Sequence, residues 1–170
     1  MTPRQRTLAA MEGRPVDRFP TAVLYHNLFV EDCFAELTSR PTWERYQLPY
    51  LEPEDYLTLY REIIARAPFD ILEPAMGNQS RAVRARQEFV PRDGVPCRHD
   101  TQTGEWVPLG APTKSGHAHD GSMNEAQTLF TREEIDAQIS LRPAETMSVD
   151  GQFDQLDAAV AEFSNTHFML

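Results

Sequence analysis

The sequence predicts an α/β fold, and three segments in its first half support this prediction. Residues 19–25 form a short apolar run bounded by Pro20 and polar residues, which is typical of a buried strand. Residues 53–66 repeat apolar side chains at helical spacing, and residues 69–74 form a second apolar run. Strand, helix and strand in this order indicate a parallel βαβ unit.

Two helices and a loop are predicted around the first strand. Thr2 and Gln5 have the spacing of a capping box, and Gly13 is suited to end the helix that this box opens. A second helix is expected over residues 28–38, because its apolar side chains fall on one face. Residues 41–49 are expected to form a loop rich in aromatic side chains.

The middle of the chain predicts an antiparallel meander over residues 81–109. Side chains alternate in character over residues 81–90, which favours a strand. Asp93-Gly94 and Thr103-Gly104 are turn signals that separate this segment from two further short strands. The meander is expected to be an excursion from the main sheet.

The remaining residues alternate between polar connections and amphipathic helices. Residues 110–127 are expected to form a loop, and a capping box at Thr131 predicts a short helix ending near residue 140. Residues 141–150 are expected to be a linker. A helix is then predicted over residues 151–163, followed by an apolar run at residues 167–170.

Length and charge exclude several classes of function. The 170 residues suit a single domain, and 16 basic against 26 acidic residues give a net charge of −10. Nucleic acids and anionic membrane surfaces require a basic face, which the sequence does not offer. No apolar run is long enough to span a bilayer. Cys33 and Cys97 are isolated, which predicts reduced thiols in a cytoplasmic protein.

The order of these segments resembles a known superfamily. The matching pieces are the opening helix, the lead-in at residues 15–20 (Pro-Val-Asp-Arg-Phe-Pro), the helix before residues 69–72, the meander containing Gly104-Glu105-Trp106, and the capped helix at Thr131. Together they resemble the N-terminal half of the uroporphyrinogen decarboxylase superfamily, which includes corrinoid-dependent methyltransferases. The resemblance implies that residues 1–170 are one partial domain, the N-terminal portion of a TIM (β/α)8 barrel, with the meander inserted in it.

One branch of that superfamily decarboxylates porphyrinogens in porphyrin biosynthesis. Its first strand ends in an Arg-Gln-Ala-Gly-Arg motif whose guanidinium groups hold the substrate carboxylates. The matching positions here are Tyr25 and Phe29, so both arginines are missing. The branch also has an aspartate after its second strand, where this chain offers only Glu73 nearby. A lyase of this kind is therefore the second candidate.

The methyltransferase branch fits the lead-in and the meander better. Its resemblance implies transfer of a methyl group between a corrinoid and a small substrate such as a thiol that zinc activates. The zinc ligands of this branch lie in the C-terminal half of the family fold, and Cys33 and Cys97 do not match them. Corrinoid and zinc are thus implied by the family alone, and no cofactor is assigned to residues of this chain.

Candidate site residues follow the two predicted strands. Active sites of TIM barrels gather at the carboxyl ends of the strands. His26 and Glu73 are the candidate catalytic residues, and Tyr25 and Asn27 are candidates for binding substrate. A loop that caps the next helix is the alternative for the residues around His26.

A second group of candidates follows Glu73. Asn78 and Arg81 are assigned to substrate binding, although Asn78 also suits an ordinary polar turn. Glu73 alternatively forms a salt bridge with Arg81 or Arg84. The pair Arg84 and Arg86 is expected on one strand face.

His117 and His119 are weak candidates for metal binding. An HxH pair on a strand places both rings on one face, as metal ligands require. The surrounding segment is rich in glycine and serine, and a solvated loop is the alternative reading of it.

A third hypothesis is a non-catalytic half-barrel. A TIM barrel typically takes about 250 residues, and open sheet edges favour pairing with another chain. The expected partners are a small-molecule substrate, and either a corrinoid protein or a complementary C-terminal chain, giving a homo- or hetero-oligomer.

Overall fold

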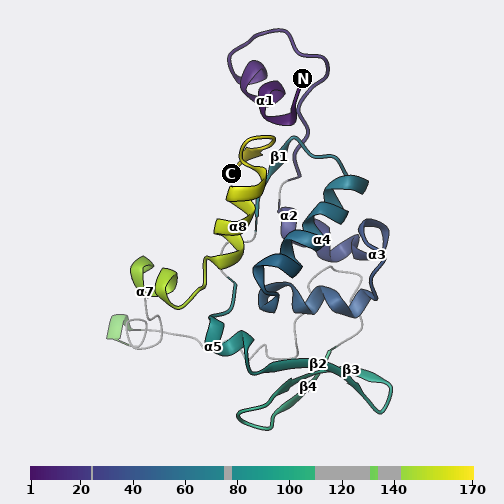
Figure 1. Cartoon of the computed structure of the whole chain (residues 1–170), viewed down its shortest axis with the longest axis vertical. Coiled ribbons are helices and arrows are strands. Elements are labelled where there is room, and N and C mark those ends of the chain that lie inside the picture. Colours follow the sequence, from purple (N-terminus) through teal and green to yellow (C-terminus); the bar gives the residue numbers. More distant parts are fainter. Residues whose placement is uncertain (24, 75–77, 110–130, 134–142) are drawn as a thin grey trace.

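The computed structural model describes residues 1–23, 25–74, 78–109, 131–133 and 143–170. Within them the chain combines helices with two small sheets, so the α/β prediction is confirmed at this level. The described part is elongated, with helix α1 at one end and the β-meander at the other (Figure 1). The main body lies between them and consists of long helices beside a short parallel sheet.

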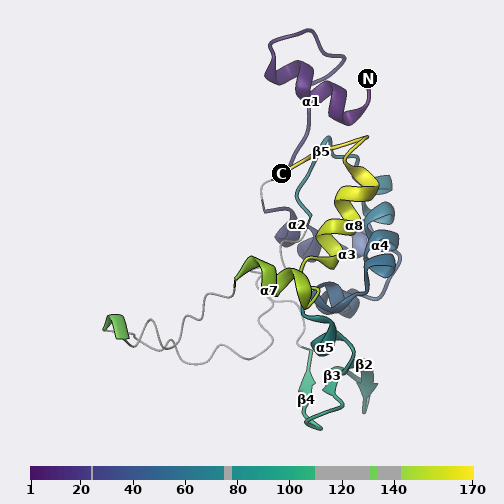
Figure 2. The same cartoon turned by 60° about the vertical axis from the view of Figure 1, so that its left-hand side comes forward.

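The centre of the body is a pair of parallel strands, each preceded by a helix. Strand β1 (Ile71–Leu72) pairs with β5 (Phe168–Met169), with Ile71 opposite Phe168. Helix α4 (Pro53–Arg66) precedes β1, and helix α8 (Asp154–Phe163) precedes β5. The two helices contact each other and lie side by side in Figures 1 and 2. Two segments about 100 residues apart therefore form one layered unit.

The hydrophobic core lies between these helices and the sheet. Helix α4 has the predicted bounds, with an amphipathic pattern and acidic side chains in its first turn. Each large apolar side chain that leaves water here contributes about 1.5–3 kcal/mol of transfer free energy. The buried residues of the core are Val30, Phe34, Leu37, Tyr56, Leu57, Leu59, Tyr60, Ile63, Phe69, Leu72, Ala159 and Phe163.

The N-terminal helix follows its prediction, whereas the strand after it does not. Helix α1 (Pro3–Met11) begins with the capping box of Thr2 and Gln5. The strand predicted at residues 19–25 is absent from the described residues 19–23, although Thr21 O accepts hydrogen bonds from the backbone N–H groups of Asp70 and Ile71. The Asp70 carboxylate takes the Thr21 N–H that a ladder would use. The left-handed backbone of Tyr25 then turns the chain.

The helix predicted over residues 28–38 is divided in two. Helix α2 (His26–Asp32) ends at Cys33, and helix α3 (Phe34–Leu37) starts directly after it. Two acidic side chains in the last turn of α2 oppose the helix dipole, which favours the break. The aromatic-rich loop is instead a 3-10 helix, η1 (Thr42–Tyr50).

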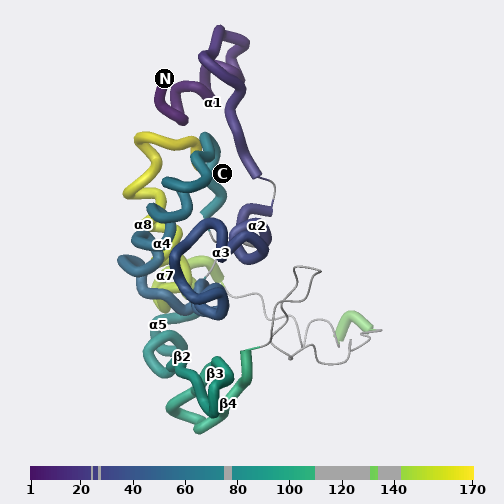
Figure 3. Tube along the Cα trace, turned by 90° about the vertical axis from the view of Figure 1, so that its right-hand side faces the viewer, coloured from purple at the N-terminus to yellow at the C-terminus, as the bar shows by residue number. Residues whose placement is uncertain are grey.

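The meander is confirmed, but it begins later than predicted. Strands β2 (Gln87–Arg92), β3 (Val95–Asp100) and β4 (Trp106–Pro108) form an antiparallel sheet in the order β2-β3-β4. Helix α5 (Arg81–Arg84) precedes them, because the Ser80 side chain caps the Val83 N–H. The prediction that Arg84 and Arg86 share a strand face is therefore wrong, because Arg84 lies in α5. Figure 3 shows the sheet at the opposite end from α1.

The C-terminal segment contains a helix that the sequence did not indicate. Helix α7 (Ala144–Val149) occupies the predicted linker, and α8 begins three residues later than predicted, at Asp154. The loop predicted at residues 110–127 and most of the helix predicted after Thr131 lie outside the described residues. Among the helices that are described, none has the length and apolar character needed to cross a membrane.

Candidate functional site

A cluster of charged side chains fastens the N-terminal segment to the start of β1. We call Arg6, Asp17, Arg18, Thr21 and Asp70 the latch cluster. The Asp70 carboxylate is fully buried and accepts hydrogen bonds from Arg6, from Arg18 Nη1 at 2.5 Å and from the Thr21 N–H at 2.8 Å. Arg6 Nε also donates to Asp17 at 2.6 Å. Two residues of the lead-in at residues 15–20, Asp17 and Arg18, therefore have a structural role in the latch cluster.

The electrostatics of the latch cluster indicate a structural role. Burial alone would raise the pKa of Asp70, but hydrogen bonds from Thr21, Arg18 and Arg6 outweigh it and hold this pKa below its ordinary value. Asp70 therefore stays ionised, and its oxygens are occupied by protein donors. Because its charged groups are engaged with one another, the cluster stabilises the fold.

The candidate site lies along the same strand, from Phe69 just before β1 to Glu73 just after it. We call His26, Tyr60, Phe69 and Glu73 the carboxyl-end site, after the position of Glu73. The His26 ring packs edge-on against Phe69, with ring centroids 5.1 Å apart, and lies 5.5 Å from the Tyr60 ring. Tyr60 Oη donates to the backbone oxygen of Glu73 at 3.2 Å. The imidazole of α2 thus contacts one side chain of α4 and the ring of Phe69, which precedes β1.

His26 is the most unusual polar group of this site. Its side chain is only 1% exposed, yet neither ring nitrogen has a hydrogen-bond partner in the part of the chain that the structure describes. Buried polar groups are nearly always paired, and each unpaired one costs about 1–3 kcal/mol. The two nitrogens therefore keep unused hydrogen-bonding capacity.

The charge state of the site follows from its burial. Burial lowers the pKa of His26 below its ordinary value, and the negative charge of Glu73 partly offsets this shift. His26 is thus neutral near pH 7, with one nitrogen as donor and the other as acceptor. Burial, together with Tyr56 and Glu73, raises the pKa of Tyr60 well above its ordinary value, so its hydroxyl keeps its proton.

The two residues expected beside His26 occupy different positions. Tyr25 is 66% exposed and has a left-handed backbone, with φ 59°. Such a conformation is uncommon for a residue other than glycine and stores strain. Asn27 lies in the first turn of α2.

Glu73 is half-buried and has no ion pair among the described residues. Arg81 and Arg84, the salt-bridge partners considered for Glu73 from the sequence, both bind Asp154 instead, at 2.6 and 2.8 Å. Glu73 is therefore left to interact with His26. The salt bridge weighed from the sequence does not form in the described part of the chain.

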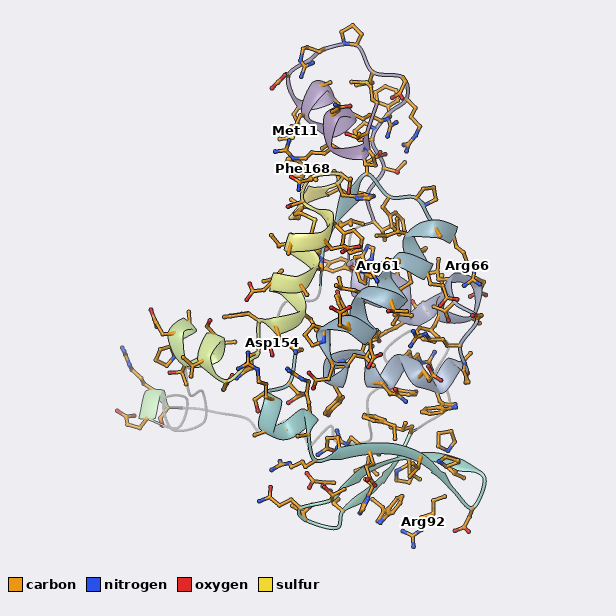
Figure 4. All side chains as sticks on the ribbon, viewed as in Figure 1. Met11, Arg61, Arg66, Arg92, Asp154 and Phe168 are labelled. Carbon is orange, nitrogen blue, oxygen red and sulfur yellow. The ribbon has the colours of Figure 1, made fainter. Side chains whose placement is uncertain are left out.

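Asn78 and Arg81 belong to a separate structural cluster around Arg84, which we call the arginine hub. The Arg84 guanidinium is 1% exposed and donates to Glu52, Asp154 and the backbone oxygens of Gln79 and Gly151. Asn78 is buried, and its side-chain amide pairs with Gln152 O and Arg84 Nη1. Asp154 lies at the junction of α8 and α5 (Figure 4). The hub joins these segments, and its polar groups are engaged with one another.

The described residues offer no metal centre. They contain no group of three or more His, Cys, Asp and Glu side chains close enough to hold a metal ion. His117 and His119 lie outside the described residues. Cys33 and Cys97 are both free thiols, as expected from their spacing.

Sequence reasoning missed three contributors to these clusters. Tyr60 resembles any core aromatic of an amphipathic helix, and only its contact with Glu73 O distinguishes it. Arg84 was placed on a strand face, although Ser80 before it was a signal for a helix start. Asp70 is a charged residue before an apolar strand, and that position was a signal for a buried ion pair.

Comparisons with known proteins do not place this arrangement in a family. No protein-family model, no curated protein and no solved structure matches the chain. The resemblance drawn from the sequence is therefore a proposal.

Proposed function

We propose that this chain forms the N-terminal part of a TIM barrel of the uroporphyrinogen decarboxylase superfamily and binds a small substrate at its carboxyl-end site. The proposed activity is that of a corrinoid-dependent methyltransferase. The observation that supports the proposal best is the buried, unpartnered imidazole of His26 beside a parallel strand, under the electrostatic influence of Glu73 at the carboxyl end of that strand. That end of the strands is where barrel enzymes bind their substrates.

The arrangement of the strands agrees with this proposal. Strand β1 and strand β5 are parallel, and each follows a helix, as expected for successive units of a barrel. The latch cluster lies at the amino end of β1, and Glu73, which has no ion pair among the described residues, follows its carboxyl end. This division between a stabilising end and a binding end is typical of barrel enzymes.

The roles of the site residues follow from their protonation. Neutral His26 donates one hydrogen bond to the substrate and accepts another, which fixes its orientation. Glu73 accepts a hydrogen bond or a proton from the substrate, since no described cation neutralises it. Tyr60 holds the backbone of Glu73, and the rings of Tyr60 and Phe69 exclude water from His26.

The charges of the site favour the methyltransferase over the decarboxylase. A porphyrinogen carries several carboxylates, which guanidinium groups would bind. The nearest candidates, Arg81 and Arg84, are committed to the arginine hub. An unpaired Glu73 carboxylate repels an anionic substrate. The decarboxylase is therefore the second candidate.

The cofactors that the family implies differ in how they fit. Zinc in a catalytic site takes three protein ligands, and the described residues offer no cluster of that size, so no step through zinc is assigned to this chain. A corrinoid would arrive on a partner protein or as a cosubstrate and would supply the methyl group. The residues of this chain would then orient the methyl acceptor.

Binding by two ligands tests the proposal. Calorimetric titration with a small methyl-accepting thiol should show binding that falls at least tenfold in His26→Ala, because the imidazole hydrogen bonds to the methyl acceptor are lost. His99→Ala makes the same change on the meander and should leave the affinity unchanged. Micromolar binding of coproporphyrin that His26→Ala abolishes would favour the decarboxylase instead.

A non-catalytic half-barrel is the remaining candidate, and the sheet edge at β5 favours it. Within the described residues, β5 pairs with β1 alone. An open strand edge is suited to pairing with another chain. Native mass spectrometry of the protein isolated from its source should then show a complex with a partner of comparable size. A complex that binds neither ligand would replace the enzyme proposal.

A further inference from the structure

Helix α2 combines features that lower its stability, and it carries His26 of the carboxyl-end site. We propose that α2 is a gate, hinged at Tyr25, whose opening admits a ligand to the ring nitrogens of His26. The proposal rests on the proposed binding at His26 and adds the route by which a ligand reaches it. Its evidence comes from the backbone of Tyr25, the ends of α2, and the burial of His26.

The hinge is a strained residue at the start of the helix. Tyr25 has φ 59° and ψ 53°, the left-handed region that disfavours residues with a Cβ atom. Its side chain is exposed and lies outside the hydrophobic core. Strain of this kind accumulates at switch regions, where its release favours movement. Leaving the left-handed conformation therefore favours the open state.

The ends of α2 add two further unfavourable terms. No side chain caps its N-terminus, so its first N–H groups lack the usual partner. Acidic side chains in its last turn oppose the helix dipole. At seven residues, α2 is also too short to be stable on its own.

Tertiary contacts oppose the opening and define the closed state. Val30 is 3% exposed in the core, and the Phe29 ring packs edge-on against Phe69 at 5.8 Å. Arg45 Nη1 donates to Glu31 O near the end of the helix, at 3.3 Å. These contacts close the gate, and the strain at Tyr25 offsets part of their free energy.

The burial of His26 makes a gate necessary for binding. At 1% exposure, its nitrogens cannot form a hydrogen bond with a ligand until a neighbouring element moves. The rings that contact His26 are those of Tyr60, in α4, and Phe69, just before β1. Both belong to the hydrophobic core. Helix α2, which carries His26 itself, is the element of the site with the least support, and elements that move for ligands come from the least stable parts of a fold.

The modification rate of His26 by diethyl pyrocarbonate measures this opening. The reagent attacks neutral imidazole, and peptide mass spectrometry at low conversion gives an initial rate for each histidine. Two variants, Tyr25→Gly and Tyr25→Ala, both lose the aromatic ring, but only glycine adopts positive φ without strain. Glycine relieves the strain of the closed state, and this effect exceeds the extra conformational freedom that glycine gains in the open state. The closed state is therefore favoured, and His26 should react about threefold more slowly in Tyr25→Gly than in Tyr25→Ala. His99, on the meander, is the internal control and should react equally in both.

Two results would overturn the gate. One is an equal His26 rate in the two variants. The other is a His26 rate in the native chain that equals the rate of global unfolding, which parallel circular dichroism in urea determines. The ligand titrations are separate from this rate, so failed binding with a glycine-dependent His26 rate would reject the proposed function and leave the gate.

Discussion

The buried carboxylate of Asp70 offers the sharpest test of how the N-terminal segment is held. Replacing it in Asp70→Asn removes the negative charge that faces Arg6 and Arg18 and turns an amide toward donors. Removing one partner of a buried ion pair costs about 3–5 kcal/mol. Arg18 is 44% exposed and can regain water, and Arg6 keeps Asp17, so we expect the lower end of that range, about 3 kcal/mol.

Urea unfolding measures this loss. With a slope of about 2 kcal/mol per molar for a small domain, the midpoint should fall by about 1–2 M urea. Asp17→Asn makes the same change of charge at a carboxylate that is 45% exposed, and its midpoint should fall by much less. An Asp70→Asn midpoint equal to that of Asp17→Asn would refute the assignment of Asp70 as the centre of the latch cluster.

The pH dependence distinguishes lost charge from altered packing. The native pKa of Asp70 is below its unfolded value, so its contribution is complete above about pH 4. It is lost as the pH falls through the lowered native value. The gap in stability between the native sequence and Asp70→Asn should therefore narrow below about pH 4. A gap that stays constant down to pH 2 would indicate a packing defect instead.

Three further predictions concern the other clusters. Arg84→Lys supplies three donors where the guanidinium serves five acceptor groups, so it should cost about 2–3 kcal/mol of unfolding free energy. The exposed Arg81→Lys should shift the urea midpoint little, and equal shifts of the two variants would contradict the hub. Because the native pKa of His26 is lowered, the free energy of unfolding should fall as the pH drops below about 6.5. His26→Leu should flatten this pH dependence, although His167, whose pKa is also lowered, keeps a contribution of the same sign. An unchanged dependence of stability on pH in His26→Leu would show that His26 is not buried in its neutral form. Gly151→Ala should lower the melting temperature more than Gly104→Ala does. Both glycines have positive φ, but only at Gly151 would an added Cβ lie 2.6 Å from Arg81 and Asp154. Equal melting temperatures of the two variants would rule out this close approach.

The parts of the fold that the sequence predicted are those with local signals. The helix over residues 53–66 has an amphipathic pattern and acidic residues in its first turn, and both act within the helix itself. The capping box of Thr2 and Gln5 spans four residues. Asp93-Gly94 and Gly104 supply the positive φ that the turns of the meander need.

The parts that it missed depend on distant contacts. The strand expected at residues 19–25 fails because Thr21 binds the side chain of Asp70, which is 49 positions away. Helix α7 has no buried residue and therefore no apolar face to indicate it. Tertiary contacts override local propensity in such segments.

The same distinction between local signals and distant contacts applies to the candidate site residues. His26 and Glu73 were found because they follow apolar runs, and their electrostatic interaction agrees with a shared site. Asn78 and Arg81 were assigned to the substrate by position alone, whereas their partners are Gln152, Arg84 and Asp154. The arginine hub connects segments about 70 residues apart, so position along the chain did not reveal it.

Histidine side-chain NMR during ligand titration tests the central claim most directly. The chain has five histidines, and labelling their imidazole nitrogens reports on each one separately. With a methyl-accepting thiol, we expect the two nitrogens of His26 to shift, because they gain their missing hydrogen bonds, while those of His99 do not. A His26 signal that stays unchanged at saturating ligand, or a response confined to other histidines, would contradict it.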